Sequence, residues 1–161
     1  MKSVNHLTSN TELPRAKRHA IVHHGWAWVT LCLALAVHVL DEALTDFLSV
    51  YNPNAQAIRQ KFPFLPVPTF TFGTWLTGLI VAIILLLSLS PYAFRRAKWA
   101  RLASYPFAIL MLVNGLMHIA GSFYLGRLMP GVYSAPLLLA SSIYLLWSVR
   151  RPRPADPWRR G

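Results

Sequence analysis

Apolar residues gather in four long stretches separated by polar breaks, and each stretch predicts one membrane-spanning helix. The stretches cover, approximately, residues 26–49, 70–89, 102–125 and 132–149. Each is close to the roughly 20 residues that cross a bilayer core of about 30 Å as a helix. A helix satisfies its backbone hydrogen bonds internally in lipid, so helix is the expected form. The pattern therefore predicts an all-α fold, a four-helix membrane bundle over 26–149.

Composition supports a membrane protein. Hydrophobic residues make up 55% of the chain and charged residues only 13%, whereas a soluble domain carries about a quarter charged residues. The single cysteine, Cys32, excludes an intrachain disulfide and a cysteine-based zinc site.

Basic residues lie mainly on one side of this arrangement. Thirteen of the sixteen lysines and arginines belong to the tail at 1–25, the loop between the second and third spans, or the tail at 150–161. Only Arg59, Lys61 and Arg127 fall on the other side. The positive-inside rule then places both tails in the cytoplasm and the protein in the inner membrane. The net charge of +11 follows from this topology and comes with no nucleic-acid-binding motif, so the expected partners are membrane lipids.

The first span carries an unusual set of polar side chains in LALAVHVLDEALTDFLSV, residues 33–50. Three of the chain's five acidic residues lie in this segment. At about 100° per residue, its polar groups share one side of the helix, roughly 140° wide. They are His38, Asp41, Glu42, Thr45, Asp46 and Ser49. Because an acid that faces lipid costs several kcal/mol, this side must face protein or trapped water.

A second polar face follows the third span. Asn114, His118 and Ser122 are each four residues apart, so they line one side of a helix. Both spans run outward from the cytoplasm in this topology, and the two polar faces meet within roughly one helical turn in depth. We therefore expect one buried cluster in the middle-to-outer part of the membrane. Its members are His38, Asp41, Glu42, Asn114 and His118. Some hydroxyl groups of the second and fourth spans could complete its wall, from Thr74, Thr77, Tyr133, Ser134, Ser141, Ser142 and Tyr144.

Four further residues receive a secondary part in this prediction. Asp46 lies near the outer end of its span, where it could be solvated or could pair with Arg127. Thr45 and Ser122 lie on the two polar faces next to the central residues.

The motif His38-Val-Leu-Asp41-Glu42 resembles that of the small bacterial membrane proteins named for His-x-x-Glu-Glu, with Asp in place of the first Glu. The later block NGLMHIAGSFYLGRLMPGVYSAPLL is similar to the second conserved block of that family. The resemblance covers about 26–149. It implies a membrane-embedded protein of unknown activity, and its motif residues carry over to the five central residues of the cluster. A looser architectural similarity to the emopamil-binding sterol isomerases is an analogy only.

Two kinds of enzyme chemistry suit this cluster. His38, Glu42 and His118 form a donor set for Zn²⁺ or Fe²⁺, with Asn114 or Asp41 orienting a ligand or a water. Such a site could activate water or oxygen against a lipophilic substrate. Alternatively, Glu42 could act as an acid and Asp41 or His38 as a base on a lipid-like substrate, without a metal.

Three non-enzymatic interpretations stay open. The cluster could relay protons or cations across the membrane, and a homo-oligomer could make such transport practicable. It could belong to an accessory or sensor protein in which histidine protonation biases helix packing. It could also be a purely structural polar network between helices.

Overall fold

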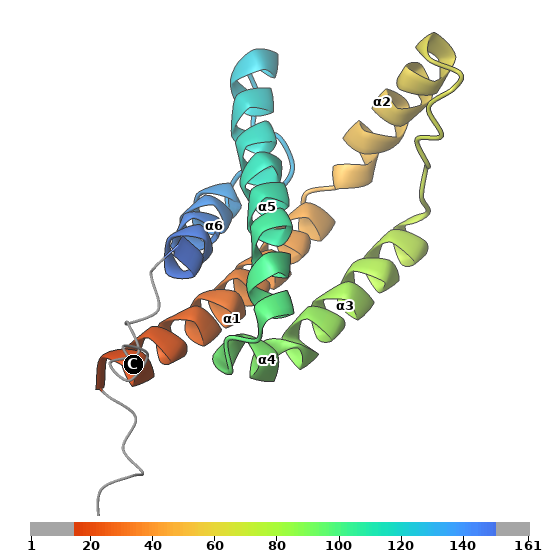
Figure 1. The fold of residues 1–161 in the computed structure, drawn as a ribbon. Helices are drawn as coiled ribbons and strands as arrows, with labels where there is room; N and C mark the ends of the chain where they lie inside the picture. Colours follow the sequence, from red (N-terminus) through yellow and green to blue (C-terminus); the bar gives the residue numbers. More distant parts are fainter. Residues whose placement is uncertain (1–14, 151–161) are drawn as a thin grey trace, which may run out of the picture.

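The computed structural model describes residues 15–150, and this part of the chain is helical, without strands (Figure 1). Residues 1–14 and 151–161, most of the two predicted basic tails, lie outside the described residues. Residues 15–25, predicted as part of the first tail, belong to the first helix. The helices are α1 (Arg15–Leu44), α2 (Phe47–Lys61), α3 (Phe72–Ser88), α4 (Ser90–Phe94), α5 (Lys98–Leu125) and α6 (Ala135–Arg150).

Three segments are long and apolar enough to cross a membrane: His23–Leu44, Phe72–Phe94 and Lys98–Leu125. The prediction of an all-α protein with apolar membrane helices is therefore confirmed for three such helices. Helix α6 is apolar but has 16 residues, about 24 Å of helix, which is less than a bilayer core. A fourth span and the cytoplasmic position of both termini therefore stay predictions.

Helix α1 is the centre of the structure. It packs against α3, α4, α5 and α6, and Figure 1 shows it passing between α3 on one side and α6 on the other. Small buried side chains such as Ala27 and Ala34 allow this close approach. Helices α5 and α6 approach closely at Gly115, where an added Cβ would lie 3.2 Å from the carbonyl oxygen of Ala135.

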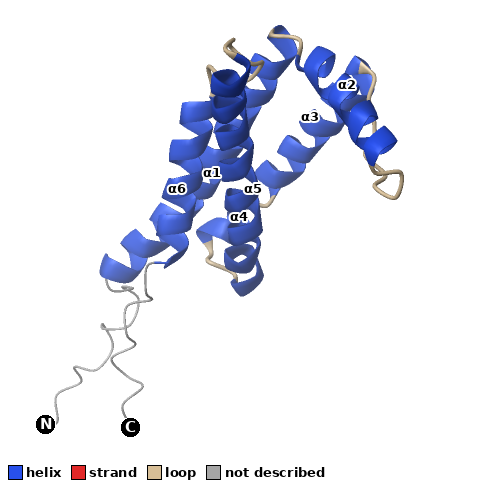
Figure 2. Ribbon diagram, turned by 90° about the horizontal axis from the view of Figure 1, so that it is seen from above, coloured by secondary structure: helices blue, strands red, loops and turns tan. Residues whose placement is uncertain are grey.

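Buried polar contacts join the helices at one end of the bundle. His24 donates its Nδ1–H to the carbonyl oxygen of Ala93 (2.9 Å), and its Nε2 lies 3.1 Å from Ser104 Oγ. The guanidinium of Arg101 donates to the carbonyl oxygen of Val149 at 3.4 Å. Figure 2 shows the start of α1 and the end of α6 at this same end of the molecule.

The first predicted span is interrupted before its predicted end. The prediction extended it to residue 49, but α1 ends at Leu44 and α2 starts at Phe47. Asp46 has φ 55° and ψ 54°, a left-handed conformation that ends the regular helix. The Thr45 hydroxyl donates to the carbonyl oxygen of Asp41 at 2.6 Å. The chain therefore turns directly after the polar segment, and α2 leads away from the bundle.

The segment that follows α2 returns to the bundle through a fixed contact. Asn52 donates its amide Nδ2–H to the carbonyl oxygen of Phe70 (2.9 Å) and accepts the Phe70 backbone N–H (3.1 Å). Tyr51 donates its hydroxyl to the carbonyl oxygen of Pro68 at 3.1 Å. These bonds fix the start of α3 next to the start of α2.

Candidate functional site

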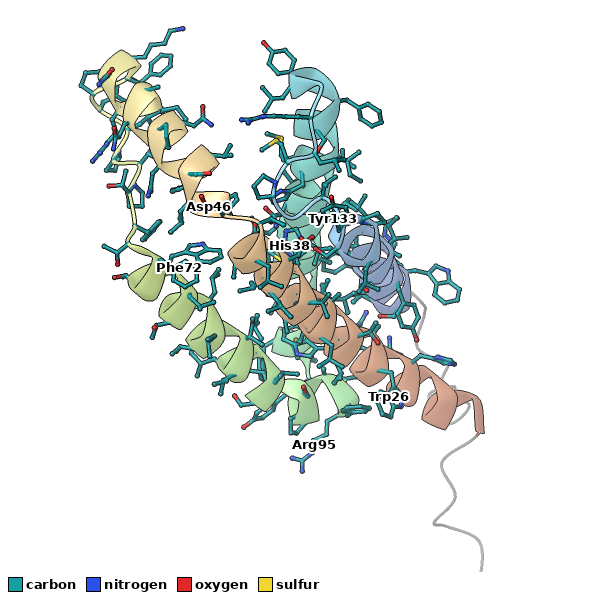
Figure 3. The ribbon with its side chains drawn as sticks, turned by 180° about the vertical axis from the view of Figure 1, so that it is seen from behind. Trp26, His38, Asp46, Phe72, Arg95 and Tyr133 are labelled. Atoms are coloured by element: carbon teal, nitrogen blue, oxygen red, sulfur yellow. The ribbon has the colours of Figure 1, made fainter. Side chains whose placement is uncertain are left out.

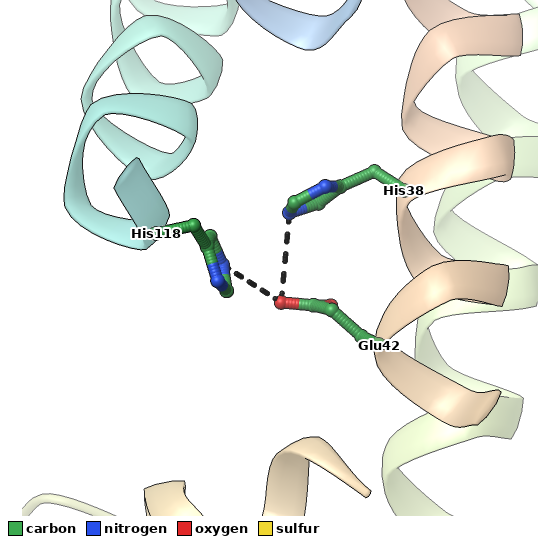
Figure 4. A group of neighbouring side chains, drawn as sticks. All are labelled: His38, Glu42 and His118. Atoms are coloured by element: carbon green, nitrogen blue, oxygen red, sulfur yellow. Dashed lines mark ion pairs between the residues drawn. The ribbon is translucent and has the colours of Figure 1, made fainter. Parts of the chain in front are cut away.

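Three buried side chains from α1 and α5 converge on one point (Figure 4). His118 Nε2 lies 3.0 Å from Glu42 Oε1, and His38 Nε2 lies 3.6 Å from the same oxygen. One potential ligand atom from each residue lies within 4.8 Å of the other two. The residues are 0% (His38), 5% (Glu42) and 4% (His118) exposed. We call this group the His38–Glu42–His118 centre.

The position of the centre follows from helix geometry. His38 and Glu42 are four residues apart on α1 and therefore lie one above the other on one face. Figure 3 shows His38 toward the end of the molecule that carries Asp46 and Tyr133, whereas Trp26 and Arg95 lie toward the opposite end. The centre is thus remote from the Arg95 end, which agrees with the depth expected from the sequence.

Asp41 acts on His38 through Ser134. The Asp41 carboxylate accepts the backbone N–H of Ser134 (2.9 Å) and its hydroxyl (2.8 Å). The Gly131 carbonyl is a more distant acceptor for that hydroxyl, at 3.2 Å, and a carboxylate is the stronger one. With its proton directed to Asp41, Ser134 Oγ accepts the Nδ1–H of His38 at 2.8 Å.

This arrangement fixes the ring of His38. Its Nδ1 carries the proton, so its Nε2 presents a lone pair. The side-chain amide of Asn114 donates to that nitrogen at 3.0 Å. The two adjacent acids of the motif therefore have different surroundings: Glu42 faces both imidazoles, and Asp41 faces Ser134.

His118 is fixed in the same way by the loop before α6. Its Nδ1 faces the carbonyl oxygen of Pro130, and because a carbonyl can only accept, this nitrogen must donate. Nε2 then presents a lone pair to Glu42 Oε1 at 3.0 Å. Two electron-rich atoms at this distance repel each other unless a proton or a cation lies between them, so this arrangement could hold either.

The loop from Met129 to Ser134 covers the centre. Ser122 accepts the backbone N–H of Met129 at 2.9 Å, and Thr45 Oγ1 accepts the backbone N–H of Gly131 at 3.3 Å. Gly131 has φ +81°, and an added Cβ would lie 2.9 Å from His118 Cε1 and 3.0 Å from Glu42 Cγ. Thr45 and Ser122 therefore hold the loop, and the loop in turn presses against the centre.

The structure separates the predicted site residues into two groups. His38, Asp41, Glu42, Asn114 and His118 form one connected network, with Thr45 and Ser122 holding its cover. Asp46 and Arg127 are exposed, and neither takes part in an ion pair within the described part of the chain. Of the two alternatives given for Asp46, the structure thus agrees with the solvated carboxylate and does not contain the pair with Arg127.

Pro130 and Gly131 are parts of the site that the sequence did not predict. A proline followed by glycine indicates a turn, but nothing in the pattern indicates that the turn folds inward. Ser134, one of seven hydroxyl residues considered for the wall, lies at the core of the network because it joins Asp41 to His38.

Aromatic rings enclose the centre on the side of α2 and α3. The rings of His38 and His118 meet edge to face with centroids 4.7 Å apart. The Phe47 ring packs beside His118, with its centroid 5.8 Å from that of His118 and 5.8 Å from that of Trp75. The centre therefore borders an aromatic wall rather than open solvent.

Residues 28–145 match the family described as "Protein of unknown function with HXXEE motif". The matched segment contains every residue of the network. No curated protein and no solved structure matches the chain.

Proposed function

We propose that this chain, which belongs to the HXXEE family, binds one divalent metal ion, zinc or iron, through His38, Glu42 and His118 as a membrane enzyme for lipophilic substrates. The observation that carries the proposal is the pair of fixed imidazoles. Both Nδ1 atoms donate to protein acceptors, so both Nε2 atoms present lone pairs. Nε2 of His118 lies 3.0 Å from Glu42 Oε1, and Nε2 of His38 lies 3.6 Å from it and accepts from Asn114. Metal-binding histidines typically have this second hydrogen bond.

The distances support a shared ion. Two ligands at about 2.1 Å from a metal lie about 3.0 Å apart in octahedral and about 3.4 Å apart in tetrahedral geometry. Oε1 of Glu42 lies 3.0 Å from one imidazole nitrogen and 3.6 Å from the other. Two histidines and one carboxylate are the ligands of hydrolytic zinc sites and of oxygen-activating iron sites. Both leave coordination positions open for water, oxygen or substrate.

Asn114 has a separate part in this proposal. Its amide occupies the His38 Nε2 lone pair and would be displaced as the ion binds. A half-turn of the amide exchanges its nitrogen and oxygen, so Asn114 could then offer an oxygen to the ion.

A second candidate function is proton transfer without a metal. It is favoured by the 3.0 Å approach of His118 Nε2 to Glu42 Oε1, which is an ordinary hydrogen-bond distance for a shared proton. Such a pair could donate and accept protons on a lipid-like substrate, or relay them across the membrane.

Metal analysis of the purified protein separates the two candidates. We expect one equivalent of zinc or iron per chain, and a visible absorption band when Co²⁺ replaces it. Glu42→Gln should remove both. Asp46→Asn is the matched control, because Asp46 is an exposed acid and asparagine tolerates its left-handed backbone. Stoichiometric metal that persists in Glu42→Gln, or no metal and no Co²⁺ band in the folded protein, would contradict the metal proposal.

A further inference from the structure

A second feature lies on the other side of α1, between α1 and α3. It is a groove of about 400 Å³, within the range of about 300–1,000 Å³ that small-molecule sites occupy. Its lining consists of Ala36, Val39, Leu40, Ala43, Leu76, Ile80, Ile83 and Ile84. The two alanines of α1 leave the space that the larger side chains of α3 border.

The lining defines the chemistry of what the groove can take. All eight side chains are aliphatic and offer neither a donor nor an acceptor. A polar head group or a peptide backbone placed there would lose its hydrogen bonds to water without replacement, which costs several kcal/mol. A hydrocarbon chain makes no hydrogen bonds to water and therefore loses none when it enters the groove.

The groove also opens toward the hydrocarbon layer of a bilayer. It lies between two of the segments that are apolar and long enough to span a membrane. Leu40, Ile80 and Ile84 at its edge are 58%, 45% and 59% exposed. An aliphatic chain could enter sideways from the lipid without crossing water.

One end of the groove is linked to the His38–Glu42–His118 centre by neighbouring residues and aromatic contacts. Ala43 and Leu76 line that end, and they follow Glu42 and Trp75 directly in the sequence. The Phe47 ring packs against the rings of Trp75 and His118, with its centroid 5.8 Å from each. Trp75 and Phe47 therefore form a chain of ring contacts that leads from the residue before Leu76 to His118.

We infer that the groove binds the aliphatic chain of the substrate, a single- or double-chain lipid, and that the polar end of this lipid reaches the centre along Trp75 and Phe47. The inference rests on the proposed function for the identity of the reacting group. It deepens that function by naming the substrate class: a lipid with an unbranched or isoprenoid chain whose polar end reaches Glu42 and His118 past Phe47.

Photolabelling tests this inference on the full chain. The protein is placed in phosphatidylethanolamine–phosphatidylglycerol nanodiscs with a fatty acid that carries a diazirine in its chain, and labelled residues are mapped by mass spectrometry. We expect labels to concentrate on the groove residues of α1 and α3. Ala36→Phe should fill the groove and lower that labelling at least fivefold. Ala120→Phe is the matched control, since Ala120 is exposed on α5.

Two outcomes would overturn the inference. Labels spread evenly over the exposed faces of α1, α3 and α5, with no response to Ala36→Phe, would mean ordinary bilayer contact. Cross-linking between two chains through the groove would mean that a second copy covers it. Should Ala36→Phe fail to fold, Ile84→Ala provides the complementary test, because a wider groove should retain or increase the labelling.

The outcome is independent of the metal proposal. Co²⁺ absorption reports on the centre, and Ala36→Phe should leave it unchanged. Labelling of the groove without any Co²⁺ binding would contradict the metal centre alone, whereas Co²⁺ binding with even labelling would contradict the groove alone.

Discussion

Replacing Gly131 by alanine tests whether the loop before α6 shapes the centre. Gly131 has φ +81°, and an added Cβ would lie 2.9 Å from His118 Cε1, 3.0 Å from Glu42 Cγ and 3.0 Å from His118 Nδ1. Ordinary contacts between carbon atoms are about 3.5–4.0 Å. The imidazole or the loop must therefore move by about 0.6 Å or more.

Gly126→Ala is a control that isolates the backbone effect. Gly126 also has a left-handed backbone, with φ +60°, but an added Cβ there meets nothing within 4 Å. Both substitutions incur the left-handed penalty of about 1–2 kcal/mol for a residue with a side chain. Only Gly131→Ala also displaces His118, whose ring is held between Pro130 and Glu42.

The expected results follow from this difference. Both variants should melt at a lower temperature than the parent in detergent, and Gly131→Ala should melt lowest. Because a site must be held within about 0.5 Å to keep its geometry, Gly131→Ala should weaken Co²⁺ or Zn²⁺ binding about 10–100-fold, the usual effect of disturbing the groups behind a metal ligand. Gly126→Ala should keep the parent affinity. Equal metal affinities for the two variants would refute the role assigned to the loop.

Three other substitutions test separate contacts. Ser134→Ala removes the acceptor of the His38 Nδ1–H and should lower metal affinity about 10-fold or more; metal titration with unchanged affinity would contradict it. Asp46→Gly relieves a left-handed backbone at an exposed residue. It should raise the free energy of unfolding by about 1 kcal/mol and with it the melting temperature; a lower melting temperature would mean that the Asp46 carboxylate stabilises the fold. Ser104→Ala leaves a buried nitrogen of His24 without its partner and should destabilise the fold by about 1–3 kcal/mol without changing metal affinity, which a combined melting and titration experiment would check.

Helical periodicity was enough to predict the central residues of the site. His38, Glu42, Asn114 and His118 share helix faces because three- and four-residue spacings place side chains on one side. The depth comparison placed the two faces at one level, and the distances of 3.0 Å between His118 and Glu42 and between Asn114 and His38 agree with it.

The loop before α6 and the helix break at Asp46 could not be predicted from periodicity. The fourth apolar stretch was expected to begin at 132, but α6 begins at Ala135, and the preceding turn carries Gly131 and Ser134 into the site. Hydropathy does not distinguish an apolar turn from the first turn of an apolar helix. The left-handed Asp46 was equally hidden, because the predicted span continues through residues 45–49 without a glycine or proline to mark a break.

The geometry of the site also gives a physical reason for the spacing of the motif. Relative to His38, a residue four positions later lies about 40° around the helix and a residue three positions later about 60° in the opposite direction. Two adjacent acids therefore flank the histidine on opposite sides, and one carboxylate cannot replace the other. Glu42 lies on the side of α5, where it meets His118. Asp41 lies on the side of the loop before α6, where it sets the orientation of Ser134 and hence the Nδ1–H of His38. One helical turn of α1 thus supplies His38, the Glu42 carboxylate beside it and the Asp41 carboxylate that orients it through Ser134. This explains why three polar residues occupy a segment otherwise suited to lipid.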